Sequence, residues 1–169
     1  MLQVSDVEVE NRLRFDNPWW VAGAGIEPDY AGLPRRAYLA SFLRLVRQAE
    51  VNRAVVLLGP RRVGKTVLVY HAIQALLDEG VSGRNILYIS LETPIFIGLT
   101  LDGLVNRFRR LFSHPAHTRL YVFFDEIQYL HDWQIHLKSL VDDQRDCRFV
   151  ATGSASAALR TQSAESGAG

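Results

Sequence analysis

The chain has a single cysteine, Cys147, so it cannot form an internal disulfide, and its composition gives no sign of an oxidising compartment. No N-terminal segment has the basic and then apolar layout of a signal peptide, and no apolar run reaches the roughly 18 residues that a membrane helix needs. The formal net charge of +1 favours neither nucleic acid nor a membrane surface as a partner. These absences predict a cytoplasmic protein that does not act at a membrane.

Lysine is scarce as well, since 17 of the 19 basic residues are arginine and only Lys65 and Lys138 are lysine. A general bias toward arginine codons accounts for this ratio, so a lysine inside a motif stands out. With 48% hydrophobic and 22% charged residues, the composition is that of an ordinary globular protein. A chain of 169 residues fits one domain, which buries roughly 70% of the surface that the unfolded chain exposes.

Short apolar runs alternate along the chain with longer segments of helical periodicity. The apolar runs span residues 54–58, 85–90, 120–124 and 148–152. The helical segments span residues 33–50, 65–79, 101–112 and 132–143. Strands that alternate with such helices predict an α/β fold, with a parallel sheet of at least four strands and helices on both faces. The uninterrupted run 54–58 predicts a strand that is buried on both faces.

The chain divides into three segments. Residues 1–33 are rich in turn-forming residues and predict an irregular N-terminal segment, whereas residues 34–154 form the core. The pair Trp19-Trp20 in the first segment is either a surface for a partner or the cap of a hydrophobic core, which is the commoner role of such pairs. Residues 155–169 are small and polar, and they predict a flexible tail.

A glycine-rich segment joins the first apolar run to the helix that follows it. Residues 59–66 read GPRRVGKT and match the pattern G-x-x-x-x-G-K-[ST]. The glycines let backbone N–H groups converge on one phosphate, and the start of a helix adds its positive dipole end. In this pattern Lys65 reaches the β- and γ-phosphates and the hydroxyl of Thr66 binds Mg²⁺, so the sequence predicts a site for Mg-ATP. The predicted nucleotide ligands are Gly59, Pro60, Arg61, Arg62, Val63, Gly64, Lys65, Thr66 and Val67.

The third apolar run leads directly into two acidic residues, Asp125 and Glu126. A carboxylate at the end of a parallel strand suits Mg²⁺, usually through a water, so Asp125 joins Thr66 as a predicted metal-site residue. The adjacent carboxylate of Glu126 suits a general base that polarises an attacking water. Glu126 and Lys65 are therefore predicted catalytic residues.

Hydroxyl side chains end the fourth apolar run. Thr152 and Ser154 are predicted to sense the γ-phosphate or to position the attacking water, although an ordinary glycine- and serine-containing turn would have the same sequence. Two arginines before the first strand, Arg35 and Arg36, either approach the nucleotide base or lie on the surface.

The motifs GPRRVGKT, FFDEIQ and ATGSAS, with NPWW at 17–20 and PRRAY at 34–38, together resemble the bacterial and archaeal AAA-type ATPases of the AAA domain 14 group. The resemblance covers about residues 12–169. It implies a three-layer P-loop NTPase fold of the AAA (ASCE) type that uses ATP and Mg²⁺, often followed in that group by a nuclease-like DUF4143 domain. It also implies a partial module that lacks the fifth strand and the lid, with an exposed strand edge that invites self-association.

Three classes of function are compatible with these motifs. The leading prediction is an ATPase that hydrolyses Mg-ATP to ADP and phosphate and so drives a conformational change in an attached domain or partner. The alternative is a nucleotide-gated switch that binds DNA or protein with negligible hydrolysis, supported by the tryptophan pair and by the basic cluster Arg107, Arg109 and Arg110. A small-molecule kinase is disfavoured, because residues 127–147 contain a single arginine where an arginine-rich lid is common.

Overall fold

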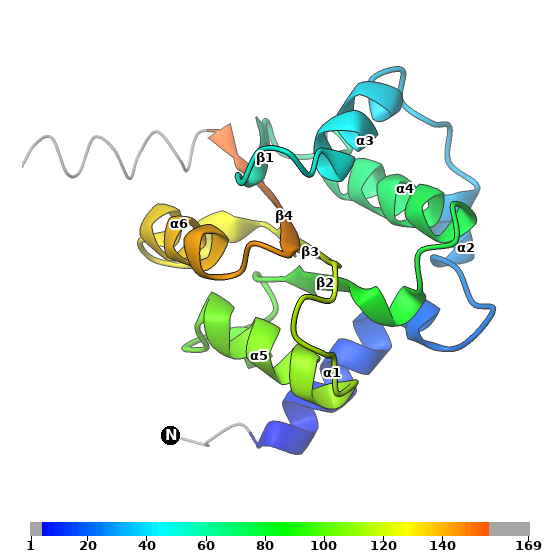
Figure 1. Cartoon of the computed structure of the whole chain (residues 1–169). Coiled ribbons are helices and arrows are strands. Elements are labelled where there is room, and N and C mark those ends of the chain that lie inside the picture. The colour runs from blue at the N-terminus through cyan, green and yellow to red at the C-terminus, as the bar shows by residue number, and fades with distance from the viewer. Residues whose placement is uncertain (1–4, 156–169) are drawn as a thin grey trace, which may run out of the picture.

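The structure is a computed structural model that describes residues 5–155. Its centre is a parallel sheet of four strands in the order β1-β4-β3-β2 (Figure 1). The strands are β1 (Val55–Gly59), β2 (Ile86–Ser90), β3 (Leu120–Asp125) and β4 (Cys147–Ser154). The helices are α1 (Asp6–Asp16), α2 (Pro28–Ala31), α3 (Leu39–Arg47), α4 (Lys65–Asp78), α5 (Leu101–Leu111) and α6 (Trp133–Asp143). Short 3-10 turns are η1 (Pro18–Trp20), η2 (Gly83–Asn85), η3 (Pro94–Phe96) and η4 (Ile127–Tyr129).

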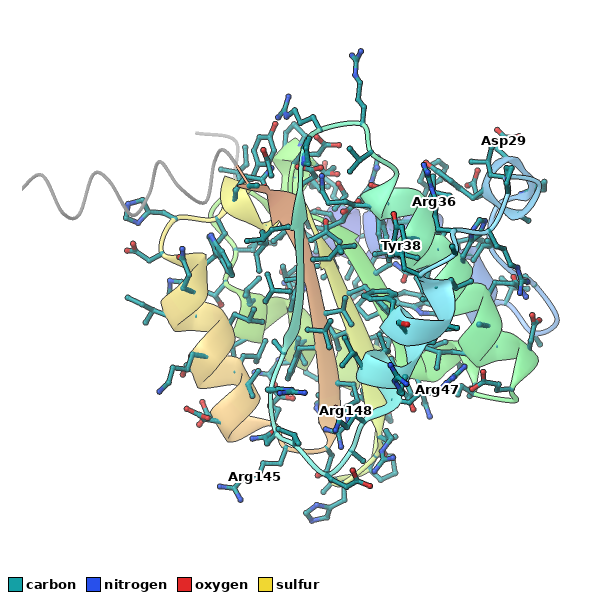
Figure 2. The ribbon with its side chains drawn as sticks, turned by 90° about the horizontal axis from the view of Figure 1, so that it is seen from above. Asp29, Arg36, Tyr38, Arg47, Arg145 and Arg148 are labelled. Atoms are coloured by element: carbon teal, nitrogen blue, oxygen red, sulfur yellow. The ribbon has the colours of Figure 1, made fainter. Side chains whose placement is uncertain are left out.

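Helices cover both faces of the sheet. Figure 2 shows α3 and α4 on one side of the strands and α6 on the other, and α5 packs beside α6. Strands β3 and β4 are buried along their whole length, as expected for parallel strands between two helical layers. The predicted α/β fold, with a parallel sheet and helices on both faces, is therefore confirmed. The helical segment predicted from residue 33 begins later, at Leu39.

Strand β1 departs from its prediction. It lies at one edge of the sheet and pairs only with β4 in the described part of the chain. Because side chains alternate along a strand, Val56 and Leu58 share one face, and they are 41% and 45% exposed. The prediction of a strand buried on both faces is thus wrong, since an apolar run does not reveal how far the helical layer extends over it.

The N-terminal segment contains the helices α1 and α2 within residues 5–33, which differs from the irregular segment predicted at residues 1–33. Ser5 and Glu8 form a capping box, in which each side chain accepts a hydrogen bond from the other residue's backbone N–H, and α1 begins there. Only Val9 and Leu13 of α1 are buried, so its apolar periodicity is too weak to be read from the sequence. Of the tail predicted at residues 155–169, all but Ala155 lies outside the described residues.

Side chains of the NPWW segment satisfy the free edge of β2. The amide of Asn17 is fully buried, and it accepts a hydrogen bond from the Tyr88 N–H at 2.7 Å and donates one to the Tyr88 carbonyl at 2.9 Å. The indole N–H groups of Trp19 and Trp20 both donate to the carbonyl of Ile86, at 3.1 and 2.8 Å. Asn17 thus takes the place of a neighbouring strand, and the tryptophan pair belongs to the core.

Replacing Asn17 by leucine is expected to lower the free energy of unfolding by about 2–4 kcal/mol. Leucine has a similar size but leaves the N–H and C=O of Tyr88 unpaired, and each buried unpaired group costs about 1–3 kcal/mol. Urea denaturation measures the change. Asn11, exposed on α1, provides the control variant Asn11→Leu, and equal losses in the two variants would contradict this role for Asn17.

Candidate nucleotide-binding site

The loop between β1 and α4 curls around the first turn of the helix. Gly64 has φ +89° and forms the N-cap of α4, which begins at Lys65. A Cβ at Gly64 would lie 2.6 Å from Nη2 of Arg36, the mobile end of a long side chain, so it is the backbone conformation that requires glycine. Within the described part of the chain, the N–H groups in the first turn of α4 have no side-chain cap, and such groups at the start of a helix suit phosphate.

Lys65 folds back over this loop. Its ammonium donates hydrogen bonds to the carbonyl oxygens of Gly59 at 3.1 Å and Pro60 at 2.7 Å, and the residue is only 7% exposed. Among the described residues it has no carboxylate partner. A nearly buried ammonium ion without a counter-charge is suited to an anionic ligand.

Asp125 is the centre of the site. Its carboxylate is at the carboxyl end of β3 and is 2% exposed. Oδ2 accepts hydrogen bonds from the hydroxyls of Thr66 at 2.8 Å and Tyr88 at 2.9 Å, while Oδ1 accepts one from the hydroxyl of Thr152. Residues from α4, β2 and β4 thus converge on one carboxylate. Hydroxyl and carboxylate oxygens so close together are ligands that Mg²⁺ accepts.

Tyr88 holds its proton in this setting. Burial, followed by the negative charge of Asp125, raises the pKa of the Tyr88 hydroxyl above its ordinary value. The phenol is the donor to Oδ2, and the raised pKa widens the pH range over which it keeps that proton. Tyr88 does not stand out in the sequence, because a tyrosine inside an apolar strand looks like a core residue. The feature of the sequence that could have indicated its role is a phenolic hydroxyl close to the end of a strand.

Glu126 follows Asp125 in a left-handed conformation, with φ +54°. Its backbone N–H donates to the hydroxyl of Thr152 at 3.2 Å, and its carboxylate accepts a hydrogen bond from Nε2 of Gln128. Oε1 of Gln128 in turn accepts from the backbone N–H of Ser154 at 3.1 Å. The structure therefore brings Glu126, Thr152 and Ser154 into one connected group, through a glutamine to which the sequence analysis assigned no role.

The remaining predicted ligands lie around the loop. Arg61 donates to the hydroxyl of Tyr129 at 3.1 Å, and Arg62 adopts φ +63°. Pro60, Arg61, Arg62 and Val63 have no buried side chain, whereas Lys65 is buried. Their contribution to a bound phosphate would come from the backbone of the loop.

Val67 lines a surface cavity of about 400 Å³ together with residues 33–37. Arg36 lies between this cavity and the loop, since its Nη2 donates to the Val63 carbonyl at 3.2 Å, and Figure 2 shows it near the first turn of α4. Arg35 and Arg36 both line this cavity. In the described part of the chain, only Arg36 has a hydrogen bond to the loop between β1 and α4.

Two of the three arginines of the basic cluster, Arg107 and Arg109, have partners within the chain. Arg107 forms an ion pair with Asp6 at 2.7 Å. Arg109 donates to Gln144 at 3.0 Å and contacts the sulfur of Cys147.

No group of three or more His, Cys, Asp or Glu side chains between residues 5 and 155 is placed to hold a metal ion. Over the same residues, no helix has the length and apolar character needed to cross a membrane.

The family model of the AAA domain AAA_14 matches residues 51–169, which is most of the chain. The chain belongs to this family. An uncharacterised protein of Haemophilus influenzae is 28% identical to it over 107 residues, which cover 62% of the chain and 25% of that protein. The chain therefore spans about a quarter of the length of this curated relative.

Solved structures with the same fold include the replication initiator DnaA bound to AMPPCP and single-stranded DNA, with a TM-score of 0.50 and 16% identity. This match covers 76% of the chain and 42% of DnaA. PCH-2 of C. elegans is similar with a TM-score of 0.46 and 19% identity over 69% of the chain and 36% of its own length. Family and fold together identify the AAA_14 chain as an ATP-binding P-loop module of the AAA type.

Proposed function

We propose that this AAA_14 module binds Mg-ATP and hydrolyses it to ADP and phosphate, and that the change at the site is passed to an attached domain or partner. The observation that carries the proposal is the convergence on Asp125 of hydroxyls from α4, β2 and β4. It lies next to the phosphate loop, residues 59–64, which joins β1 to α4. Hydrolysis needs a general base beside this site, and Glu126 follows Asp125 directly. A loop that only binds nucleotide would need neither the hydroxyl groups around Asp125 nor the adjacent carboxylate of Glu126.

The donor set fits Mg-ATP. Lys65 and the first turn of α4 supply positive charge and N–H donors for the phosphates, and Lys65 has no carboxylate that would compete for it among the described residues. Thr66 and Asp125 supply the hard oxygens that would hold Mg²⁺ directly or through water. When bound, Mg²⁺ neutralises charge that develops on the phosphate oxygens.

The chain's own residues have distinct roles in this scheme. Lys65 exchanges its two carbonyl acceptors for phosphate oxygens. Glu126 accepts a proton from the attacking water. Thr152 donates to Asp125 and accepts from the Glu126 N–H, so it joins the metal carboxylate to the base. The backbone of Ser154 is linked to the same base through Gln128, which supports a role of β4 in sensing the γ-phosphate.

Removal of the metal tests this proposal. Phosphate release from ATP is measured with the chain in Mg²⁺ and again in EDTA, with nucleotide binding followed in parallel. We expect turnover in Mg²⁺, a loss of at least about tenfold in EDTA, and full recovery when Mg²⁺ is restored. Turnover that persists in EDTA would contradict the assignment of Thr66 and Asp125 to a metal site.

A further inference from the structure

The turn η4, which follows the acidic pair, connects three parts of the site. Gln128 in this turn donates from Nε2 to a carboxylate oxygen of Glu126 and accepts at Oε1 from the Ser154 N–H at 3.1 Å. The next residue, Tyr129, accepts from Arg61 of the phosphate loop at 3.1 Å. The phosphate loop, the proposed base and the end of β4 are therefore linked through two adjacent side chains.

We propose that Gln128 is a positioning residue, which holds the carboxylate of Glu126 for its encounter with the attacking water. This inference rests on the proposed function. It assigns to Gln128 a role through Glu126 and no contact with nucleotide. The Gln128 amide bonds Glu126 through Nε2 and Ser154 through Oε1.

A glutamate side chain needs such a restraint. The backbone of Glu126 is held by its left-handed conformation and by the hydrogen bond from its N–H to Thr152. Beyond the backbone, the side chain has three rotatable bonds, and fixing them costs conformational entropy. The Gln128 amide donates to one oxygen and leaves the other oxygen available to accept a proton from water.

Gln128 itself is held firmly against β4. A Cβ added at Gly153 would lie 3.0 Å from Oε1 of Gln128 and 3.3 Å from a methyl carbon of Leu58. Glycine at this position therefore leaves space for the glutamine side chain to lie on the strand. With Oε1 fixed by Ser154, the amide plane is set, and so is the direction in which Nε2 donates.

Two substitutions separate positioning of the base from support of the strand. Gln128→Met keeps the size and removes both hydrogen bonds, whereas Gln128→Glu keeps an acceptor for Ser154 but removes the donor and sets a carboxylate against Glu126. We expect both variants to lower kcat by about 10- to 100-fold with the ATP Kd within twofold of the parent. Gln134→Met, at an exposed position on α6, is the control and is expected to match the parent.

Affinity for ADP with aluminium fluoride provides a second readout that does not depend on turnover. We expect both Gln128 variants to weaken this complex while ADP alone binds as before. Parent-like kcat and parent-like binding of the complex in Gln128→Met would overturn the inference, and so would full activity in Gln128→Glu. If Glu126→Gln abolishes turnover and Gln128→Met does not, the inference alone fails. If Glu126→Gln turns over at the rate of the parent, Glu126 is not the base and the inference fails while hydrolysis stands. If the parent itself releases no phosphate from Mg-ATP, the proposed function fails.

Discussion

Replacing Lys65 by alanine is expected to weaken ATP binding at least about 100-fold, which corresponds to about 2.7 kcal/mol. The ammonium is almost buried, it lies over the phosphate loop, and within residues 5–155 its partners are two carbonyl oxygens. Hydrogen bonds to charged groups contribute about 1.5–3 kcal/mol each, so the loss of the ammonium that is proposed to meet the phosphates has a large effect. Calorimetric titration with Mg-ATP measures it.

The chain offers a natural control, because Lys138 is its second and last lysine. The Lys138 side chain on α6 is 82% exposed and lies 3.5 Å from Asp142. Lys138→Ala is expected to bind ATP as the parent does, since a surface ion pair contributes about 0–1 kcal/mol. Thermal unfolding is a further check: ATP at about 100 times its Kd stabilises the parent by about 2.7 kcal/mol and should stabilise Lys65→Ala far less. Equal stabilisation of both would disprove the role of Lys65.

Replacing Glu126 by glutamine is expected to lower the rate of phosphate release by about 10²–10⁴-fold while ATP binding stays within about threefold of the parent. Glutamine keeps the shape of the side chain and an acceptor for Gln128 but cannot take a proton from water. The bound nucleotide still meets Lys65, Thr66 and Asp125, so its ground-state affinity is preserved. Single-turnover phosphate release and equilibrium binding are measured on the same preparation.

A glutamate elsewhere in the chain gives the matched control. Glu92 is exposed and lies two residues beyond the end of β2, whose register places Ser90 beside Asp125. Glu92→Gln removes the same charge near the same end of the sheet and is expected to leave turnover unchanged. Comparable rates in Glu126→Gln and the parent would show that another group activates the water.

The sequence determined the architecture because its signals are local and periodic. Apolar runs of strand length alternating with helical segments, interrupted by Gly59 and Gly64, predicted a parallel sheet with helices on both faces, and the sheet is observed. The phosphate loop could be located without a structure, because its glycines and Lys65 must be close in the chain to surround one phosphate. Asp125 was recognisable because carboxyl ends of parallel strands share one edge of the sheet.

Only the tertiary structure decided how those residues are held. Tyr88 and Asp125 are 37 residues apart in the chain and Gln128 and Ser154 are 26 apart, so no local pattern joins either pair. Helix α1 is not apparent in the sequence because its buried face is narrow. The hydrogen bonds of Asn17 to β2 are not apparent either, because a single amide that replaces a strand partner leaves no periodic pattern.

The difference has one physical reason. Backbone conformation follows from propensity and periodicity over a few residues, whereas a side-chain hydrogen bond depends on where two distant segments meet. The composition of the chain and its motifs therefore determined that it has a P-loop on a parallel sheet. The packing of β2, β3 and β4 decided that the hydroxyls of Thr66, Tyr88 and Thr152 converge on Asp125.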